Sequence, residues 1–345
     1  MKYPKDKVLE QKIALQTEAE KCHAGFNNRS TVSLAMGLGK SKVAINRIQA
    51  VFKKKPKANI IFCGARELYL ENFKKELIKF KLKKFIPKIT FSCTQSLEKY
   101  KMNVFDLVIV DESHMLVNMY LEFIEFQYKL NSNIEILCLT GTPIKNNIRL
   151  NKLVPISIYK SMDESIENDF LNEYEIKVVY HDLDTAKNVH IKTASYDFYT
   201  SESESYKRVY RKYIDTSYDE EGVWKKQAFS REGQFLKSFF KNLQSKKQEA
   251  LRLLELHKED KSLVYAGSIP QANTFGGLIY HSKVAKEPRK VAYNSFCKLT
   301  KGKLINVDGI KEAVTIPGLN IGIIMHCGSS ENNLEQIVGK QICSL

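Results

Sequence analysis

The sequence predicts an α/β protein in which two parallel sheets, each covered by helices, flank a mostly helical segment. Short β-rich runs alternate with longer helical patterns over residues 1–150, and the alternation returns over residues 246–345. Between them, residues 151–245 contain more Tyr, Ser and Glu and show little strand pattern. We therefore predict three parts, of which the last is a short and incomplete second lobe.

Four runs supply the predicted strands of the first part. They are residues 31–35, 58–64, 104–110 and 134–140. Three of these runs are nearly all apolar, which is typical of strands that are buried on both faces. Residues 42–52, which follow the first run, have apolar side chains at helical spacing.

The middle part has strand character only at residues 176–180 and 189–198. Two sets of large side chains recur there at helical spacing: Tyr206, Val209, Tyr210, Tyr213 and Ile214, and Phe235, Leu236, Phe239, Phe240 and Leu243. We predict that they form a packed helical core, with a basic and aromatic surface as the alternative. In the last part, residues 262–266, 303–307 and 321–326 are predicted strands.

Length and composition indicate an ordinary globular chain of about two domains. The chain has 345 residues, of which 43% are apolar and 27% charged, which excludes a disordered tail or a miniature scaffold. No apolar run approaches the ~20 residues of a membrane span, and the first residues lack the apolar stretch of a signal peptide. We expect a cytoplasmic protein, in the host cytoplasm if a phage encodes it. Its seven cysteines form no C-x-x-C pair, so we expect reduced thiols and no structural zinc.

The net charge of +15 favours an acidic polymer as a partner, and nucleic acid is the obvious candidate. The basic residues are 45 Lys and only 9 Arg. That imbalance is also typical of an AT-rich genome. Composition alone therefore leaves nucleic-acid binding and codon bias as equal explanations.

A glycine-rich loop follows the first predicted strand. Gly37 and Gly39 let backbone amides approach a phosphate, Lys40 can reach the β- and γ-oxygens, and the hydroxyl of Ser41 can bind Mg²⁺. The pattern departs from the strict Walker motif because Leu34 stands where that motif begins with glycine.

A pair of adjacent carboxylates ends the third predicted strand. Asp111 can hold the water shell of Mg²⁺, and Glu112 can polarise the attacking water. Carboxylate pairs are uncommon at the carboxyl end of a buried strand, where open α/β sheets bind their ligands. The fourth strand ends in Thr140-Gly141-Thr142-Pro143.

In this order and spacing, Gly-x-Gly-Lys-Ser, Asp-Glu-Ser-His and Thr-Gly-Thr-Pro resemble the first RecA-like lobe of superfamily 2 helicases and translocases. The resemblance implies two RecA-like lobes with ATP between them, and hydrolysis that opens and closes the cleft. Lys40, Asp111 and Glu112 would carry the chemistry, with Ser41 and Asp111 on Mg²⁺. The implied nucleotide-binding residues are Gln16, Gly37, Leu38, Gly39, Lys40, Ser41, Thr140 and Thr142. His114 would couple to ATP or serve only as a packed histidine.

Further segments resemble the nucleic-acid and second-lobe motifs of that family. Arg66, Thr94 and Gln95 match motifs Ia and Ib, and Ser268, His281 and Thr315 fall in or beside the second-lobe motifs. The resemblance implies that these six residues contact nucleic acid. Residues 336–343 fall where the family has the arginine-bearing motif VI. Gln336 is kept for the nucleotide, but Ile337, Lys340 and Cys343 replace the three arginines.

The sequence therefore predicts an ATP- and Mg²⁺-dependent helicase or translocase. The Met-Gly-Leu-Gly-Lys loop and the Asp-Glu-Ser-His box favour the Swi/Snf-like and phage recombination-type DNA helicases over the RNA-directed DEAD-box group. For the missing arginines we consider three explanations: Lys340 acts alone, a second chain supplies an arginine, or the chain is truncated and weakly active. The alternative function is a regulatory nucleic-acid-binding protein that keeps the fold and hydrolyses ATP weakly or not at all.

Overall fold

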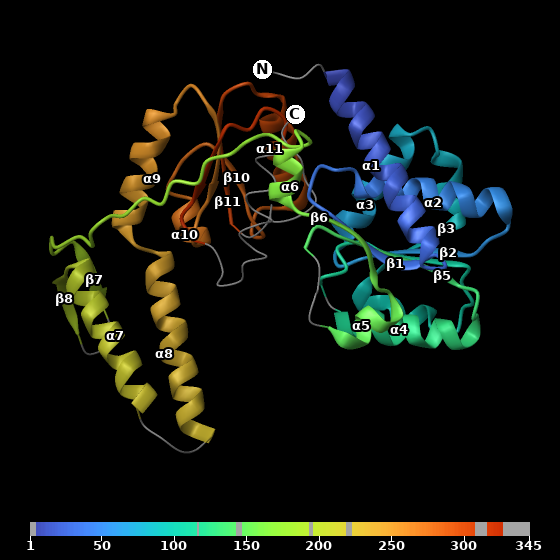
Figure 1. The fold of residues 1–345 in the computed structure, drawn as a ribbon. Coiled ribbons are helices and arrows are strands. Elements are labelled where there is room, and N and C mark those ends of the chain that lie inside the picture. Colours follow the sequence, from blue (N-terminus) through green and yellow to red (C-terminus); the bar gives the residue numbers. More distant parts are fainter. Residues whose placement is uncertain are drawn as a thin grey trace. The chain divides into compact units, whose positions relative to one another are not determined.

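The computed structural model describes residues 5–115, 117–142, 147–192, 196–218, 223–307 and 316–326. The chain divides into two compact units, Met1–Tyr174 and Glu175–Leu345, which are coloured along the chain in Figure 1. The first unit extends beyond residue 150, where the sequence placed the first boundary. None of the helices in the described ranges is both long and apolar enough to cross a membrane.

The first unit is built on a six-stranded sheet in the order β3-β2-β4-β5-β1-β6, with every neighbouring pair parallel. The strands are β1 (Arg29–Leu34), β2 (Ile60–Gly64), β3 (Ile89–Cys93), β4 (Leu107–Val110), β5 (Glu135–Thr140) and β6 (Ile156–Lys160). The four predicted runs become β1, β2, β4 and β5, which confirms the predicted parallel sheet. The edge strands β3 and β6 are partly exposed, so neither forms the continuous apolar run that marked the others.

Helices cover both faces of this sheet. They are α1 (Lys5–Gly25), α2 (Lys40–Lys54), α3 (Glu67–Lys79), α4 (Val117–Leu130), α5 (Ile148–Leu153) and α6 (Met162–Glu167), with 3₁₀ helices η1 (Lys83–Lys88) and η2 (Thr94–Tyr100). Figure 1 shows α1, α2 and α3 on one side of the sheet and α4 and α5 on the other. Two covered faces explain why the central strands β2 and β4 consist almost entirely of apolar residues.

The core beneath α4 contains alternate residues of neighbouring strands, as the period of two in a strand requires. Cys63 on β2, Val108 on β4 and Cys138 on β5 pack there with Tyr120 and Ile124 of α4. Both cysteines are fully buried. They behave as the small apolar side chains that the sequence predicted.

The second unit contains a second parallel sheet, in the order β10-β11-β9-β12. Its strands are β9 (Lys261–Tyr265), β10 (Leu278–Tyr280), β11 (Gly302–Asn306) and β12 (Ile321–Ile324), and its helices are α9 (Gln244–Leu256), α10 (Ile269–Ala272) and α11 (Lys286–Lys298). One core packs Leu254 and Ala250 against Val264, and another packs Phe296 against Leu263. This sheet, buried on both faces, confirms the prediction of a second RecA-like lobe.

In the sequence between strands β6 and β9, the chain forms a hairpin of strands and a hairpin of helices. Strands β7 (Val189–Lys192) and β8 (Asp197–Thr200) pair antiparallel, and α7 (Glu202–Tyr218) lies beside α8 (Val223–Lys241), as Figure 1 shows. The Tyr206 ring lies 6.3 Å from that of Phe239 and 5.7 Å from that of Phe240, centroid to centroid. The predicted packing of these aromatic rings is therefore present, but Tyr210 and Phe235 are exposed, so the predicted helical core is only partly buried. The predicted strand at residues 176–180 is wrong, because that segment is exposed and joins no sheet.

Candidate functional site

Three chain segments meet at the carboxyl edge of the first sheet. Strands β4, β5 and β1 are neighbours in the sheet, and all run parallel. They end at Val110, Thr140 and Leu34, directly before the carboxylate pair, the Thr-Gly-Thr segment and the glycine-rich loop. The order of the strands thus brings together motifs that lie about a hundred residues apart in the sequence.

The glycine-rich loop depends on two left-handed residues. Gly37 has φ 84° and Gly39 has φ 91°, a region that residues with a Cβ rarely adopt. Gly39 also precedes α2 directly. A Cβ at this position would lie 2.2 Å from Nε2 of Gln16, so both the backbone and the space require glycine. The loop therefore presents the free N–H groups at the start of α2, which is a favourable place for an anion.

Gln16 reaches this loop from α1. Its Nε2 donates a hydrogen bond to the carbonyl of Leu38 at 3.2 Å. Leu38 itself is fully buried. Ser41 lies in the first turn of α2, next to Lys40. The structure thus gathers the predicted residues Gln16, Gly37, Leu38, Gly39, Lys40 and Ser41 around one loop.

The ammonium group of Lys40 lies between the ends of β1 and β5. It donates to the carbonyl oxygen of Leu34 at 3.1 Å. On the other side, a Cβ at Gly141 would approach its Nζ to 3.3 Å. Glycine at 141 therefore leaves room for the lysine, a requirement that the sequence alone did not indicate.

The carboxylate pair sits beside this lysine with a charge imbalance. Partial removal from water, together with the neighbouring Glu112, raises the pKa of Asp111 from 3.8 to about 7, and Lys40 opposes this increase. The backbone N–H of Glu112 donates to Oδ1 of Asp111 at 3.1 Å. The two carboxylates supply hard oxygen donors, and a single lysine does not balance their charge, so a divalent cation would stabilise the pair and the residues fit Mg²⁺.

Glu112 itself has a strained backbone, with φ 49°. A left-handed residue other than glycine costs about 1–3 kcal/mol and persists where its surroundings enforce it. The following N–H of Ser113 donates to the carbonyl of Leu139 at 2.9 Å, and Tyr120 donates from its hydroxyl to the carbonyl of Ser113 at 2.6 Å. These two bonds anchor the turn that aims Glu112. The sequence analysis did not identify Tyr120.

His114 connects the carboxylate segment to the end of β5. Its Nδ1 lies 2.9 Å from Oγ1 of Thr140 and 3.5 Å from Oε2 of Glu112. Burial lowers the pKa of His114, and the charge of Glu112 acts in the opposite direction. The Thr140 hydroxyl can donate to the carbonyl of Thr142 at 2.9 Å while it accepts from the N–H of Thr142 at 3.1 Å. In that arrangement Nδ1 of a neutral His114 carries the proton and donates to Thr140.

Comparison with known proteins agrees with this architecture. Residues 8–145 match the family model described as type III restriction enzyme, res subunit. The helicase domain of Pyrococcus furiosus Hef aligns with 93% of this chain and 92% of its own at a TM-score of 0.53 and 11% identity. The chain has the fold of a superfamily 2 helicase core. No curated protein matches it in sequence.

Two further structures share this helicase fold. The type ISP restriction-modification enzyme LlaBIII, solved bound to DNA, aligns with 94% of this chain at a TM-score of 0.57 and 14% identity, and the match spans 26% of LlaBIII. Saccharomyces cerevisiae Dbp5, solved with RNA and ADP BeF3, aligns with 90% of this chain and 75% of its own, at a TM-score of 0.53 and 12% identity. At these identities the likeness establishes the fold alone.

The predicted nucleic-acid residues of the first unit lie at the same edge of the helicase core. Arg66 is exposed and precedes α3, Thr94 begins η2 and is buried, and Nε2 of Gln95 donates to the carbonyl of Ala65 at 3.0 Å. They follow β2 and β3, which are neighbours in the sheet. The structure therefore groups these three residues on one stretch of the edge.

The predicted residues of the second unit are placed differently. The Ser268 hydroxyl caps α10 by accepting from the N–H of Gln271 at 3.3 Å. His281 is only 3% exposed, and its Nε2 lies 2.9 Å from Oδ1 of Asn273. Burial lowers the pKa of His281. Both side chains serve the structure of their own unit. Thr315, Gln336 and Lys340 lie outside the described residues.

Proposed function

We propose that this chain is an ATP-dependent nucleic-acid helicase or translocase that acts on DNA and uses Mg²⁺. One observation carries the proposal: Lys40, Asp111, Glu112 and His114 form a single electrostatic cluster beside a glycine-rich loop that opens α2. An acidic pair, one lysine and free helix amides at the carboxyl edge of a parallel sheet suit a nucleoside triphosphate better than any neutral ligand.

Each residue of this cluster has a distinct task in phosphoryl transfer. Lys40 and the amides around Gly39 bind the phosphate oxygens, and Ser41 and Asp111 would hold Mg²⁺. When bound, the ion neutralises phosphate charge and polarises the phosphorus–oxygen bonds. Glu112 accepts a proton from the attacking water. Its strained backbone fixes the carboxylate in advance, so little reorganisation is needed at the moment of reaction.

The histidine contact offers a route from hydrolysis to movement. His114 lies next to Glu112 and is hydrogen-bonded to Thr140, which is in turn bonded to Thr142. A change in the charge on Glu112 therefore reaches the segment after β5 through three polar contacts. We propose that Thr140 and Thr142 transmit the nucleotide state, as the resemblance to the helicase family implies.

The preference for DNA rests on the sequence motifs, because proteins of this fold include one solved with DNA and one solved with RNA. The exposed Arg66, with Thr94 and Gln95 near it, supplies a surface for the backbone of either polymer. The Met-Gly-Leu-Gly-Lys loop and the Asp-Glu-Ser-His box favour DNA.

Phosphate release from ATP tests the proposal most directly. We expect the wild-type chain to hydrolyse ATP with Mg²⁺, and to do so faster when DNA is added than when RNA is added. Glu112→Gln should bind ATP with unchanged affinity but lose roughly 10²–10⁴-fold in turnover, since it removes only the proton acceptor. Exposed Glu122→Gln on α4 is the matched control and should keep full turnover. Equal turnover in Glu112→Gln and wild type would refute the assignment.

One observation favours the second candidate, a regulator that binds nucleic acid without hydrolysis. In the segment that resembles motif VI, Ile337, Lys340 and Cys343 stand where the family has arginines, and an arginine finger contributes about 10³–10⁵ in rate in related phosphoryl-transfer enzymes. Lysine at 340 has charge but not the planar fork that contacts two phosphate oxygens. The regulator would bind ATP and nucleic acid yet release no phosphate with any polymer.

A further inference from the structure

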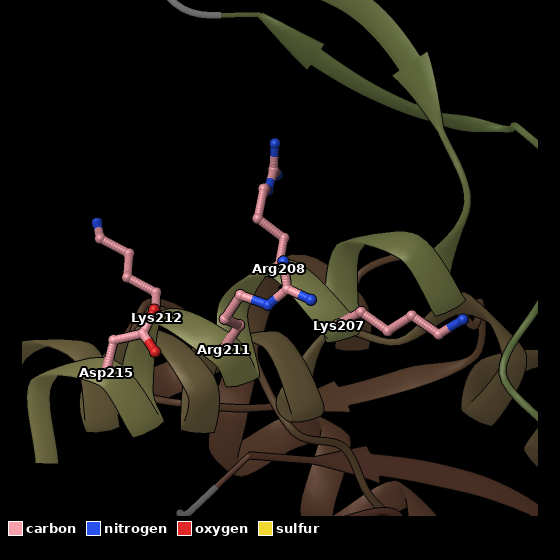
Figure 2. A pocket seen from close by; sticks show the side chains of 5 residues that line it. All are labelled: Lys207, Arg208, Arg211, Lys212 and Asp215. Atoms are coloured by element: carbon pink, nitrogen blue, oxygen red, sulfur yellow. The ribbon is translucent and has the colours of Figure 1, made fainter. Parts of the chain in front are cut away.

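Helix α7 carries its basic side chains on the side opposite its aromatic core. Tyr206 packs against Phe239 and Phe240 of α8. Lys207, Arg208, Arg211 and Lys212, which we call the basic face, line an open hollow of about 430 Å³ with Asp215 at one end. Figure 2 shows these side chains spreading from neighbouring turns of the helix, with Arg208 directed toward the strands of the hairpin. No aromatic side chain lines the hollow.

Two of the three acidic residues of α7 do not neutralise this face, because they are engaged elsewhere, and the third, Asp215, lies at one end of the hollow. Glu202 accepts hydrogen bonds from the N–H groups of Gln244 and Ser245, at the start of α9. Glu204 accepts from the hydroxyl of Thr200 at 2.9 Å. Both carboxylates therefore fasten the first turn of α7 to its surroundings. The middle of the helix is left with an excess of positive charge.

Within the basic face, Lys212 has a carboxylate partner and the other three cations do not. Nζ of Lys212 lies 3.2 Å from Oε1 of Glu232, which is only 3% exposed. Among the described residues, no carboxylate lies within salt-bridge distance of Lys207, Arg208 or Arg211. These three side chains are thus free to meet an external anion.

The presence of arginine at positions 208 and 211 is a second indication that this face binds an anion. The chain uses 45 Lys against 9 Arg, so two arginines three residues apart run against its own composition. A guanidinium differs from an ammonium mainly in its planar fork, which binds phosphate through two parallel hydrogen bonds. Arg208 is also held in place, since its guanidinium carbon lies 5.8 Å from the ring centre of Phe198 on β8.

We propose that the basic face of α7 binds the phosphate backbone of a nucleic-acid strand, as a contact outside both sheets. The inference rests on the proposed function, in which the core acts on nucleic acid. Lys207 and Arg211 are four residues apart, as are Arg208 and Lys212, so each pair spans about 6 Å along the helix. Two such rows can follow successive phosphates. Because four cations and one carboxylate line the hollow and no aromatic ring of the described residues does, the contact reads charge and not base identity.

The test measures binding of labelled DNA, single-stranded and duplex, to the full chain over a range of salt concentrations. Arg208→Ala/Arg211→Ala should weaken binding about 25- to 60-fold near 0.1 M salt and reduce the log–log salt slope by about 1.4 to 1.8, the effect of two lost phosphate contacts. Arg252→Ala/Lys258→Ala, at exposed positions on and just after α9, removes the same charge and should leave the slope unchanged.

Two further variants separate phosphate binding from a structural role. Lys207→Ala/Arg211→Ala keeps the contact of Arg208 with Phe198 and should lose the same part of the slope. Arg208→Lys/Arg211→Lys should keep the slope but weaken binding, because it preserves charge without the fork. ATP turnover without DNA should stay at the wild-type rate in each variant.

The possible failures are distinguishable. If the wild type binds DNA and the basic-face variants bind it with the same affinity and slope, the contact on α7 is refuted and the proposed function stands. The same holds if the α9 control loses as much as the basic-face variants. A wild-type chain that binds neither DNA nor RNA overturns the proposed function and this contact with it.

Discussion

Replacing Asp111 with asparagine should stabilise the first unit at neutral and alkaline pH. The pKa of Asp111 is raised from 3.8 to about 7 by desolvation and by Glu112, which means that folding disfavours its charged form. Asparagine has nearly the same shape and carries no charge. The substitution therefore removes an electrostatic cost and leaves the end of β4 in place.

The size of the effect follows from the two pKa values. A carboxyl whose pKa rises on folding contributes full stability below pH 3.8 and loses it as the pH rises through 7. The two values differ by about three, and each pKa unit corresponds to about 1.4 kcal/mol, so the loss approaches about 4 kcal/mol above pH 7. Relative to wild type, Asp111→Asn should gain almost nothing at pH 4 and most of this amount at pH 8.

Urea unfolding of the full chain, followed by far-UV circular dichroism at several pH values, measures this difference. Trp224 is the only tryptophan and belongs to α8 in the second unit, so its fluorescence follows that unit separately. His23 also contributes to the pH dependence. Burial lowers its pKa from 6.5 to about 3, so the first unit loses stability as the pH falls below 6.5. Wild type and variant share His23, so its contribution cancels in the comparison.

Glu122→Gln is again the control, since it removes one exposed negative charge from the same unit. It should give no gain that grows with pH. The reasoning fails if the advantage of Asp111→Asn changes by less than about 1 kcal/mol between pH 4 and pH 8, which is close to the error of extrapolated unfolding energies. Loss of stability in Asp111→Asn at pH 8 would show that the carboxylate is satisfied in the folded chain and that no charge imbalance exists.

Two other substitutions test the geometry around the loop. Gly39→Ala should lower stability by about 1–3 kcal/mol and abolish ATP binding. The reason is that residue 39 has a left-handed backbone and its Cβ would collide with the amide of Gln16. Thermal melting measures the loss of stability, and a nucleotide-binding assay measures the loss of ATP binding. Normal ATP affinity in Gly39→Ala would contradict the loop assignment. Thr140→Val removes the oxygen that lies 2.9 Å from Nδ1 of His114 and should cost about 1–3 kcal/mol in unfolding free energy. If Thr140 also transmits the nucleotide state, stimulation of phosphate release by DNA should fall more than release without DNA, and an equal fall in both would contradict that role.

Much of the first unit could be predicted because both faces of its central strands are buried in the apolar core. Residues 107–110 and 135–140 are covered on both faces, so their sequences are apolar and end abruptly at charged or small residues. Those endings are also where the site lies. The same physical fact therefore revealed the strands and the loops that carry the chemistry.

The edge strands could not be predicted in this way. Ile156–Lys160 pairs with β1 on one side only, and four of its five residues are partly or fully exposed. Its short sequence, Ile-Ser-Ile-Tyr-Lys, is not the continuous apolar run that marked the central strands, so the sequence placed it in the middle segment and put the boundary of the first unit at 150. Nor did spacing indicate that His281 is buried and hydrogen-bonded to Asn273, because that contact depends on tertiary packing.

The distribution of charge supports the site independently of any motif. The chain carries a net charge of +15, yet at the end of β4 it places two carboxylates beside a single lysine and keeps a histidine with a lowered pKa next to them. The chain is rich in lysine, yet among the described residues it places no second lysine beside this pair to neutralise it. Since burying an uncompensated carboxylate lowers stability, the arrangement favours the proposed site, in which a cation joins the pair. On α7 the imbalance has the opposite sign, with unpaired cations on an exposed helix face, which suits a partner that carries the negative charge itself.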